Sequence, residues 1–318
     1  MKKILIVGAG AMGAAFSIPL LDNGHSVALT EPYNFKLLQK LNSKKKIHPS
    51  LNINLPKKLK INKFSSDILD RKWDLIVIAV SSIGIDLIGK NLSKIKNKSP
   101  ILVLTKGLKL DGRNLISMSS LLRTYNKNLN ISVLKGPCLA KELARKVKSF
   151  TVVANKNINT AKKIGKLIST NYYQTEFSRD VNGVEFLSAI KNIYSMIIGA
   201  GQWHNTSSAL FRKSIDEMKY LANYFKGKKE TVYGLAGLGD LYVSAMGGRN
   251  SKMGEYLGKG YTFTRAKKKF MKNDTVEGAD LAIEIAPFVF KKINKRKVPL
   301  MISLLEAIVK NKKLKIKY

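Results

Sequence analysis

The stretch that decides the fold is Ile4-Leu5-Ile6-Val7-Gly8-Ala9-Gly10-Ala11-Met12-Gly13. Four apolar residues, of the kind that fill a buried strand, run directly into a glycine loop of the form G-x-G-x-x-G. A helical pattern follows over residues 11–23 and stops at Gly24, a suitable residue to end a helix. A glycine loop between a strand and a helix predicts a dinucleotide-binding turn.

Each glycine of this loop has a physical reason to be there. Gly8 permits the tight turn, Gly10 lets the backbone approach a pyrophosphate, and Gly13 allows the helix to pack closely on the strand. The first helical turn then offers N–H groups and the positive end of the helix dipole to the phosphates. The alternative is a helix that merely packs on a strand through small residues. We predict that the cofactor contacts Gly8, Gly10, Ala11, Met12 and Gly13.

Glu31 lies 18 positions after Gly13, just beyond the second predicted strand at residues 26–29. A carboxylate there can accept hydrogen bonds from both ribose hydroxyls, and it would repel a 2′-phosphate. This favours NAD as the cofactor over NADP. No arginine stands near Glu31 in the sequence, although Lys36 offers a nearby cation.

The first half of the chain repeats the strand signal. Residues 74–80 form a continuous β-branched run, as a buried parallel strand should, and shorter runs cover 101–104, 131–134 and 150–153. Strands that alternate with helices predict an α/β fold with a doubly wound parallel sheet of the Rossmann type.

From about residue 181 the short strand runs vanish, and the patterns become helical. The stretch 234–260 is Gly-rich, and we expect it to carry loops between helices. The chain of 318 residues is long enough for about two domains. We therefore predict a dinucleotide-binding domain over 1–180 and a mostly α-helical second domain over 181–318. The helices of the second domain are expected at 183–200, 207–225, 275–293 and 299–311.

Composition excludes several classes of protein. With 45% hydrophobic and 8% aromatic residues, the chain can bury a sizeable core and is not disordered or collagen-like. A single cysteine, Cys138, excludes an internal disulfide and a thiolate zinc site. The three histidines are far apart and show no ligand spacing, so we expect no metal. Low cysteine usage favours a reduced, cytoplasmic compartment.

The formal net charge of +36 raises the question of an anionic partner. Short lysine-rich runs recur along the whole chain, which favours a solvated basic surface over a dedicated patch. No basic stripe with interleaved aromatics is evident, so we expect no specific nucleic acid, and a nucleic-acid-binding protein is kept only as a remote alternative. Lys2 and Lys3 followed by the uncharged run 4–21 superficially resemble a targeting segment, but three glycines and Pro19 interrupt it. We expect no membrane span.

Several motifs occur together in a specific order. They are the glycine loop 8–13, LTKGL at 104–108, KGPCLAKE at 135–142, AIKN at 189–192, GLGDL at 237–241, GGRN at 247–250, and Glu277-Gly278. In order and spacing they resemble the NAD(P)-dependent glycerol-3-phosphate dehydrogenases over nearly the whole chain. The resemblance implies an oxidoreductase that interconverts sn-glycerol 3-phosphate and dihydroxyacetone phosphate with NAD(H), and it implies a homodimer.

Lys191 is the candidate catalytic residue. It stands in an otherwise apolar helical stretch, 186–198, where a lysine is costly unless it is used. In a closed cleft, desolvation and neighbouring cations lower the pKa of a lysine toward neutrality, which suits proton transfer. The resemblance implies that Lys191 is the proton donor and acceptor. Asp240 either bonds a substrate hydroxyl or holds Lys191 in place.

The resemblance also implies the binding residues. Lys106, at the carboxyl end of a predicted strand, would contact both substrate and the nicotinamide side of the cofactor. The substrate phosphate would be held by Arg249 and Asn250, together with Ser244 and Asn192, because a guanidinium can form two parallel hydrogen bonds to phosphate oxygens. The substrate-binding set is Lys106, Gly136, Cys138, Asn192, Asp240, Ser244, Gly248, Arg249 and Asn250. Beyond the glycine loop, the cofactor-binding set is Glu31, Lys106, Ala140, Arg249 and Glu277.

The chain departs from the family pattern at several positions. Met12 replaces a usual tryptophan, Cys138 replaces a usual serine and donates hydrogen bonds only weakly, and Glu31 stands where relatives often carry an arginine region. The loop between Lys191 and Asn205 is shorter than usual. This leaves open another phosphorylated polyol, or a keto acid as in the ketopantoate reductases, as the substrate.

Overall fold

The structure is a computed structural model that describes residues 1–96 and 98–317. The chain forms two compact units. Unit 1 comprises Met1–Lys106 and Met118–Val181, and unit 2 comprises Gly107–Ser117 and Asn182–Tyr318. The predicted domains, 1–180 and 181–318, stay a prediction. The compact units differ from them mainly because residues 107–117 group with the helical unit.

Unit 1 is built on an eight-stranded sheet in the order β12-β11-β10-β7-β6-β1-β2-β5. Strands β10, β7, β6, β1, β2 and β5 are parallel to one another. Residues 4–7 of β1 and all four residues of β6 are buried, as expected when helices cover both faces. The bounds are β1 (Lys3–Val7), β2 (Ser26–Glu31), β5 (Lys60–Lys63), β6 (Leu75–Ile78), β7 (Ile101–Val103), β10 (Ile131–Lys135), β11 (Ser149–Ala154) and β12 (Tyr173–Ser178).

The predicted fold class is confirmed, but the sheet is mixed and not wholly parallel. β11 runs antiparallel to β10, and β12 then runs parallel to β11. The connection between β10 and β11 contains only the five-residue helix α6 (Ala140–Ala144). A parallel neighbour usually needs a crossover built on a longer helix that packs along the sheet, and this short connection has none. β11 therefore starts at the edge where β10 ends.

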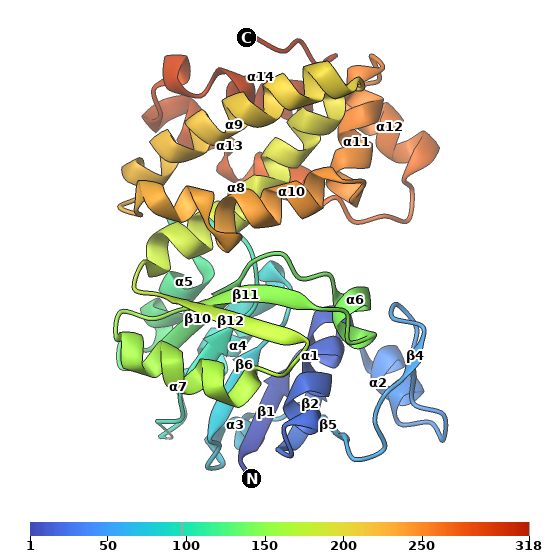
Figure 1. Ribbon diagram of the computed structural model, residues 1–318, viewed down its shortest axis with the longest axis vertical. Coiled ribbons are helices and arrows are strands. Elements are labelled where there is room, and N and C mark those ends of the chain that lie inside the picture. The colour runs from blue at the N-terminus through green and yellow to red at the C-terminus, as the bar shows by residue number, and fades with distance from the viewer. Residues whose placement is uncertain (97, 318) are drawn as a thin grey trace. The chain divides into compact units, whose positions relative to one another are not determined.

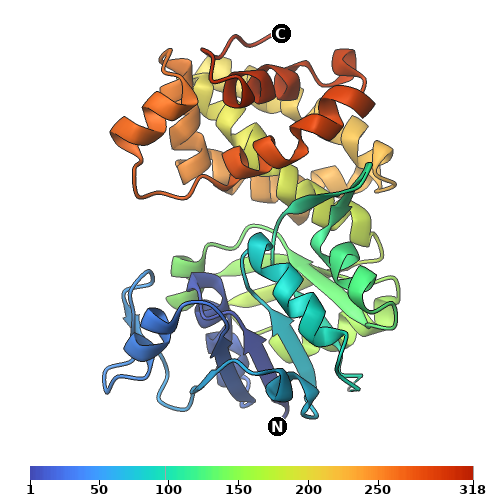
Figure 2. The same cartoon turned by 180° about the vertical axis from the view of Figure 1, so that it is seen from behind.

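Helices cover both faces of this sheet. α1 (Ala11–Asp22) and α7 (Ile158–Ile168) lie on one face, in front of the strands in Figure 1. α4 (Ile85–Leu92) and α5 (Met118–Tyr125) pack together on the other face, which the reverse view brings forward (Figure 2). Smaller elements complete the unit: α2 (Phe35–Leu41), β3 (Ile47–His48), β4 (Ile53–Asn54), α3 (Ser66–Asp70) and the 3₁₀ turn Ser82–Gly84.

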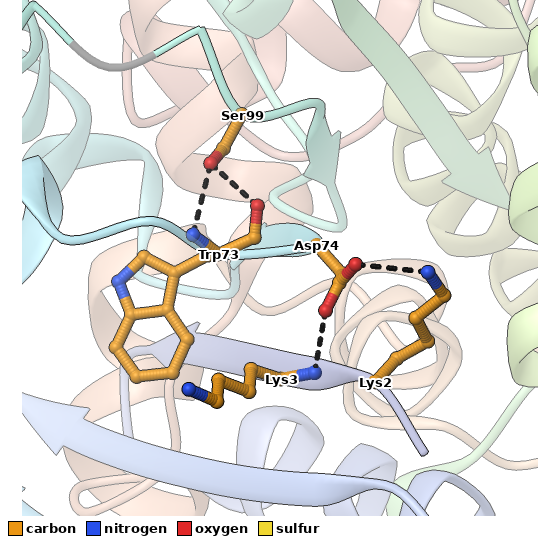
Figure 3. A network of polar contacts seen from close by, with 5 residues as sticks. All are labelled: Lys2, Lys3, Trp73, Asp74 and Ser99. Atoms are coloured by element: carbon orange, nitrogen blue, oxygen red, sulfur yellow. Dashed lines mark hydrogen bonds and ion pairs between the residues drawn. The ribbon is translucent and has the colours of Figure 1, made fainter.

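A polar network ties the strands together at the amino edge of the sheet (Figure 3). The Asp74 carboxylate accepts hydrogen bonds from the Lys3 backbone N–H at 2.8 Å and from Lys2 Nζ at 3.1 Å. The hydrogen bond from the Lys3 N–H is the main reason that the pKa of Asp74 is lowered. Nearby, Ser99 Oγ accepts from the Trp73 N–H and donates to the Trp73 carbonyl. The Asp74 contacts fix the start of β1 against the start of β6, and the Ser99 contacts join the residues that precede β6 and β7.

Unit 2 is mostly helical, and its core surrounds α8 (Val181–Ala200), which is labelled in Figure 1. The four predicted helices correspond to α8, α9 (His204–Tyr224), α13 (Glu277–Lys292) and α14 (Pro299–Val309). The unit also contains the hairpin of β8 (Leu108–Asp111) and β9 (Asn114–Ser117), and the 3₁₀ turns Lys229–Tyr233 and Lys295–Lys297.

The region 234–260, expected to carry loops between helices, is itself largely helical. It holds a π-helical turn, Leu235–Gly239, followed by α10 (Asp240–Ala245) and α11 (Arg249–Gly258), and α12 (Phe263–Phe270) comes next. Gly237, Gly254 and Gly258 of this region serve close packing between segments. A Cβ on Gly254 would lie 1.9 Å from the Met196 carbonyl oxygen of α8, so only glycine fits there.

Within the described residues, no helix is both long enough and apolar enough to cross a membrane. The same part of the chain contains no cluster of three or more His, Cys, Asp or Glu side chains that could hold a metal ion.

Candidate active site

The carboxyl ends of the parallel strands of unit 1 meet at one edge of the sheet. β1 lies between β2 and β6, so the chain order reverses there, and ligands of doubly wound sheets bind at this kind of switch point. Most of the predicted cofactor residues follow these strands directly. The edge therefore brings together Gly8–Gly13 after β1, Glu31 at the end of β2, Lys106 after β7, and Gly136, Cys138 and Ala140 after β10.

The glycine loop has room for a pyrophosphate. Gly8 has a φ of +109°, and a Cβ there would lie 2.7 Å from the Ala79 carbonyl. A Cβ on Gly13 would lie 1.9 Å from the Gly8 oxygen, whereas one on Gly10 would meet no atom within 4 Å. Gly10 caps α1 without a side-chain hydrogen bond, and no acidic residue occupies the first turn. An open, electropositive helix N-terminus fits the phosphates of a dinucleotide.

Glu31 has a structural role that the sequence did not predict. Its side chain is 6% exposed, and its Oε2 accepts a hydrogen bond from the Ala9 N–H at 2.8 Å. Its Oε1 accepts from the backbone N–H groups of Tyr33 and Asn34, at 2.9 and 3.1 Å. The carboxylate therefore joins the end of β2 to the glycine loop and places a negative charge beside that loop. Contact with the ribose stays a prediction.

His48 is a contributor to the loop that sequence reasoning missed. Its buried ring lies with Nε2 3.0 Å from the Ala9 carbonyl oxygen, and Nδ1 accepts from the Leu51 N–H. Burial lowers the pKa of His48, and the neutral ring with a proton on Nε2 satisfies both contacts. No motif surrounds His48, so nothing in the sequence links it to a loop 39 residues away.

The remaining predicted residues of unit 1 follow β7 and β10. Lys106 is half-buried and is the last residue of the first segment of unit 1. Gly136 is buried with a φ of +127°, a conformation that favours glycine. Cys138 and Ala140 are half-buried in the loop and at the start of α6.

In unit 2, Lys191 is buried and paired. It is 6% exposed on α8, and its Nζ donates a hydrogen bond to Asp240 Oδ1 at 2.8 Å and another to Ser244 Oγ. Asp240 and Ser244 are four residues apart on α10, so they share one face of that helix. The π-helical turn immediately before Asp240 is of a kind often found at functional sites.

These contacts bear on two predicted roles. Of the two roles considered for Asp240, the structure shows contact with Lys191. Ser244, expected beside the substrate phosphate, also contacts Lys191. A buried ammonium held by a carboxylate and a hydroxyl can donate a proton to, or stabilise, an oxyanion that forms beside it.

The other predicted residues of unit 2 lie where α8, α11 and α13 converge. Asn250 Oδ1 accepts from the Gly278 N–H at 2.9 Å, and Arg249 Nη2 lies 3.4 Å from Glu277 Oε1. A Cβ on Gly278 would lie 2.6 Å from the Asn192 carbonyl oxygen, so glycine permits this close helix contact. The half-exposed Arg249 begins α11, and its N-cap Gly248 makes no side-chain cap. An arginine at an open helix N-terminus suits a phosphate.

Family models match both parts of the chain. Residues 3–161 match the model of the NAD-dependent glycerol-3-phosphate dehydrogenase N-terminus, and residues 180–316 match that of the NAD-dependent glycerol-3-phosphate dehydrogenase C-terminus. The chain belongs to this family. The resemblance inferred from the ordered motifs is thereby confirmed.

Relatives of the glycerol-3-phosphate dehydrogenase family match over most of their length. A Fusobacterium nucleatum protein named glycerol-3-phosphate dehydrogenase [NAD(P)+] is 32% identical over 288 residues, covering 87% of this chain and 84% of the relative. An Archaeoglobus fulgidus protein named NADP(+)-dependent glycerol-3-phosphate dehydrogenase is 28% identical over 309 residues, covering 92% and 90%.

Solved structures agree on the fold. The glycerol-3-phosphate dehydrogenase of Coxiella burnetii superposes with a TM-score of 0.85 at 24% identity, covering 98% of this chain and 96% of that one. A 2-dehydropantoate 2-reductase described as putative, from Enterococcus faecalis, gives only 0.53 at 16% identity, covering 97% of each chain. The fold therefore lies nearer to the glycerol-3-phosphate dehydrogenase than to this keto-acid reductase.

Proposed function

We propose that the protein interconverts sn-glycerol 3-phosphate and dihydroxyacetone phosphate by hydride transfer with NAD(H). The observation that carries this proposal is the buried Lys191, held by Asp240 and Ser244, in a chain of the glycerol-3-phosphate dehydrogenase family. Unit 1 would hold the cofactor through the glycine loop, and the nicotinamide would supply or accept the hydride at substrate C2.

Lys191 moves the proton in this proposal. During reduction, the C2 carbonyl oxygen gains negative charge, and the Lys191 ammonium donates a proton to it. During oxidation, the neutral amine takes the hydroxyl proton as the hydride leaves C2. Asp240 and Ser244 hold Nζ in place, which reduces the cost of orienting it in the transition state.

The substrate phosphate would bind at the N-terminus of α11. The Arg249 guanidinium can form two parallel hydrogen bonds to phosphate oxygens, and the dipole of the ten-residue helix adds to the attraction. Asn250 uses its oxygen on Gly278, which leaves its amide NH₂ as the donor for a substrate oxygen. Lys106, Gly136 and Cys138 stay in the proposal as substrate-binding residues, as the family resemblance implies.

We also propose that NAD is preferred to NADP. The support is the Glu31 carboxylate, which lies against the glycine loop where a 2′-phosphate would bring a second negative charge. The names of the two relatives above include NADP or NAD(P), so this preference would be a property of this chain.

A substrate panel tests the proposed function. The purified protein is mixed with NADH and with dihydroxyacetone phosphate, other keto-phosphates or ketopantoate, and NADH consumption is followed. We expect dihydroxyacetone phosphate to give the highest kcat/KM. Faster turnover of ketopantoate, or of a different keto-phosphate, would overturn the assignment of the substrate.

A further inference from the structure

A second buried lysine, which the proposed chemistry does not use, lies at the sheet edge of unit 1. Lys135 is the last residue of β10 and is only 2% exposed. Its Nζ donates hydrogen bonds to the Thr105 carbonyl oxygen at 2.7 Å and to the Val103 carbonyl oxygen at 3.2 Å. Lysine is rarely buried to this degree, so a specific interaction must compensate for the lost hydration of the ammonium.

The two carbonyl groups lie where the pairing of β7 with β10 ends. β10 pairs with β7 in parallel up to Val133 opposite Val103. Beyond that point β10 continues to Lys135 and then turns at Gly136, whose φ is +127°. The Lys135 side chain reaches the β7 carbonyls past the last paired residues, and so extends the contact between the two strands.

The segment after β7 is thus supported from both neighbouring strands. On the β6 side, the Leu104 N–H donates to the Ile78 carbonyl at 2.9 Å, and Thr105 Oγ1 donates to the Val80 carbonyl at 2.8 Å. On the β10 side, Lys135 Nζ holds the Thr105 carbonyl. The next residue is Lys106, after which the chain leaves unit 1.

We propose that Lys135 is a positioning residue, whose buried ammonium fixes the backbone that carries Lys106. Its effect on substrate binding rests on the proposed function, in which Lys106 contacts the substrate. Because Lys135 also begins the loop that contains Gly136 and Cys138, one side chain joins two of the proposed substrate-binding loops. Its positive charge adds to the attraction of this edge for an anionic substrate.

Hydrogen exchange tests the structural part without any substrate. The full chain is compared with Lys135→Met, a variant of similar length that cannot donate, and with Lys291→Met, a control at an exposed lysine of α13. In Lys135→Met we expect amides of residues 104–107 to exchange about tenfold faster, with β1 unchanged. Equal exchange of 104–107 in all three proteins would overturn the proposal, whatever the substrate.

A double-mutant cycle tests the link to Lys106. KM and kcat for dihydroxyacetone phosphate are measured for the starting protein, Lys106→Met, Lys135→Met and the double variant. We expect Lys135→Met to raise KM about tenfold when Lys106 is present, but less than about twofold when it is replaced, with kcat changed less than KM. Fully additive effects on KM would show that Lys135 does not act through Lys106, and would overturn the proposal.

A conservative variant separates positioning from general stability. Lys135→Arg keeps the charge and the donors, so we expect it to restore part of the KM lost in Lys135→Met. If Lys135→Met does not fold, Lys135→Arg is carried through the same cycle, and its effect on KM must again depend on Lys106. A kcat loss with unchanged KM in every variant would indicate a purely structural role and contradict the proposal.

Failure of the starting protein to reduce dihydroxyacetone phosphate would instead contradict the proposed function, and the hydrogen-exchange result would still test the role of Lys135.

Discussion

At the scale of single residues, the Ala9 peptide is held on both sides. Its N–H donates to Glu31 and its carbonyl oxygen lies 3.0 Å from His48 Nε2. Both partners are buried, and both come from segments far from the loop in sequence. The loop is thereby fixed before the cofactor arrives, which reduces the ordering cost of binding.

Replacing His48 should therefore weaken cofactor binding. We expect His48→Ala to raise the Kd for NADH about tenfold, because the Ala9 carbonyl loses its donor and the loop loosens. The matched control is His25→Ala, which removes a histidine whose Nε2 lies 3.0 Å from the Leu167 carbonyl oxygen. Titration of NADH by fluorescence measures both. Equal weakening in the two variants would contradict a specific role for His48.

Glu31 should determine the choice of cofactor. We expect kcat/KM to be at least about tenfold higher with NADH than with NADPH, since the carboxylate repels a 2′-phosphate. In Glu31→Gln the ratio should narrow, although both cofactors lose affinity because the glycine loop loses a strong acceptor. Steady-state rates with both cofactors decide this. A starting protein that uses NADPH better than NADH would show that the charge of Glu31 does not control selection.

At the scale of elements, a buried carboxylate joins three helices of unit 2. Glu217 of α9 accepts hydrogen bonds from the Leu300 and Met301 N–H groups, at 2.6 and 3.1 Å, at the start of α14. It also accepts from the hydroxyl of Tyr194, 3.0 Å away on α8, one turn after Lys191. Burial raises the pKa of Glu217 to about 7, although these donors oppose the rise.

This raised pKa predicts a pH dependence of stability. The folded protein holds the Glu217 proton more tightly than the unfolded chain, so its contribution is fully present below the usual pKa of 4.5 and is lost as the pH rises through about 7. The unfolding free energy of the starting protein minus that of Glu217→Gln should fall by about 3 kcal/mol over this range. Urea denaturation at several pH values measures it.

The control for this prediction is the neighbouring residue Asp216. It forms an exposed ion pair with Arg212, so Asp216→Asn should change the unfolding free energy by less than about 1 kcal/mol at any pH. A pH-independent difference for Glu217→Gln, or an equal slope for Asp216→Asn, would contradict the prediction.

The elements show what sequence could and could not predict. The glycine loop, the strands around it and the four long helices follow from local periodicity and end signals. The helices in 234–260 were missed because the space around Gly254 depends on α8, which is distant in sequence. The antiparallel direction of β11 was also not predicted, because it depends on the short connection between β10 and β11.

Some residues of the candidate site could be predicted from the sequence, and others could not. Motif order singled out Lys191, Asp240 and Arg249, and the structure shows the first two in contact. The roles of His48 and Lys135 could not be predicted, because each depends on a backbone carbonyl brought close only by the folded chain. Glu31 was singled out, but its bond to Ala9 was not foreseen.

At the scale of the whole molecule, the net charge of +36 should steer an anionic substrate. We expect kcat/KM for dihydroxyacetone phosphate to fall about threefold or more as ionic strength rises from roughly 0.02 to 0.3 M, because screening shortens the reach of the basic field. Stopped-flow rates with sodium chloride measure this, with the melting temperature recorded at each salt concentration. A kcat/KM independent of salt would show that the charge plays no part in substrate capture.

The most direct test of the central claim is the turnover of Lys191→Met. Its side chain fills similar space but cannot donate or accept a proton at the position held by Asp240 and Ser244. We predict that kcat for dihydroxyacetone phosphate falls by about a hundredfold or more, while the Kd for NADH stays within about twofold. Turnover within a few-fold of the starting protein, with Lys291→Met behaving identically, would contradict proton transfer by Lys191.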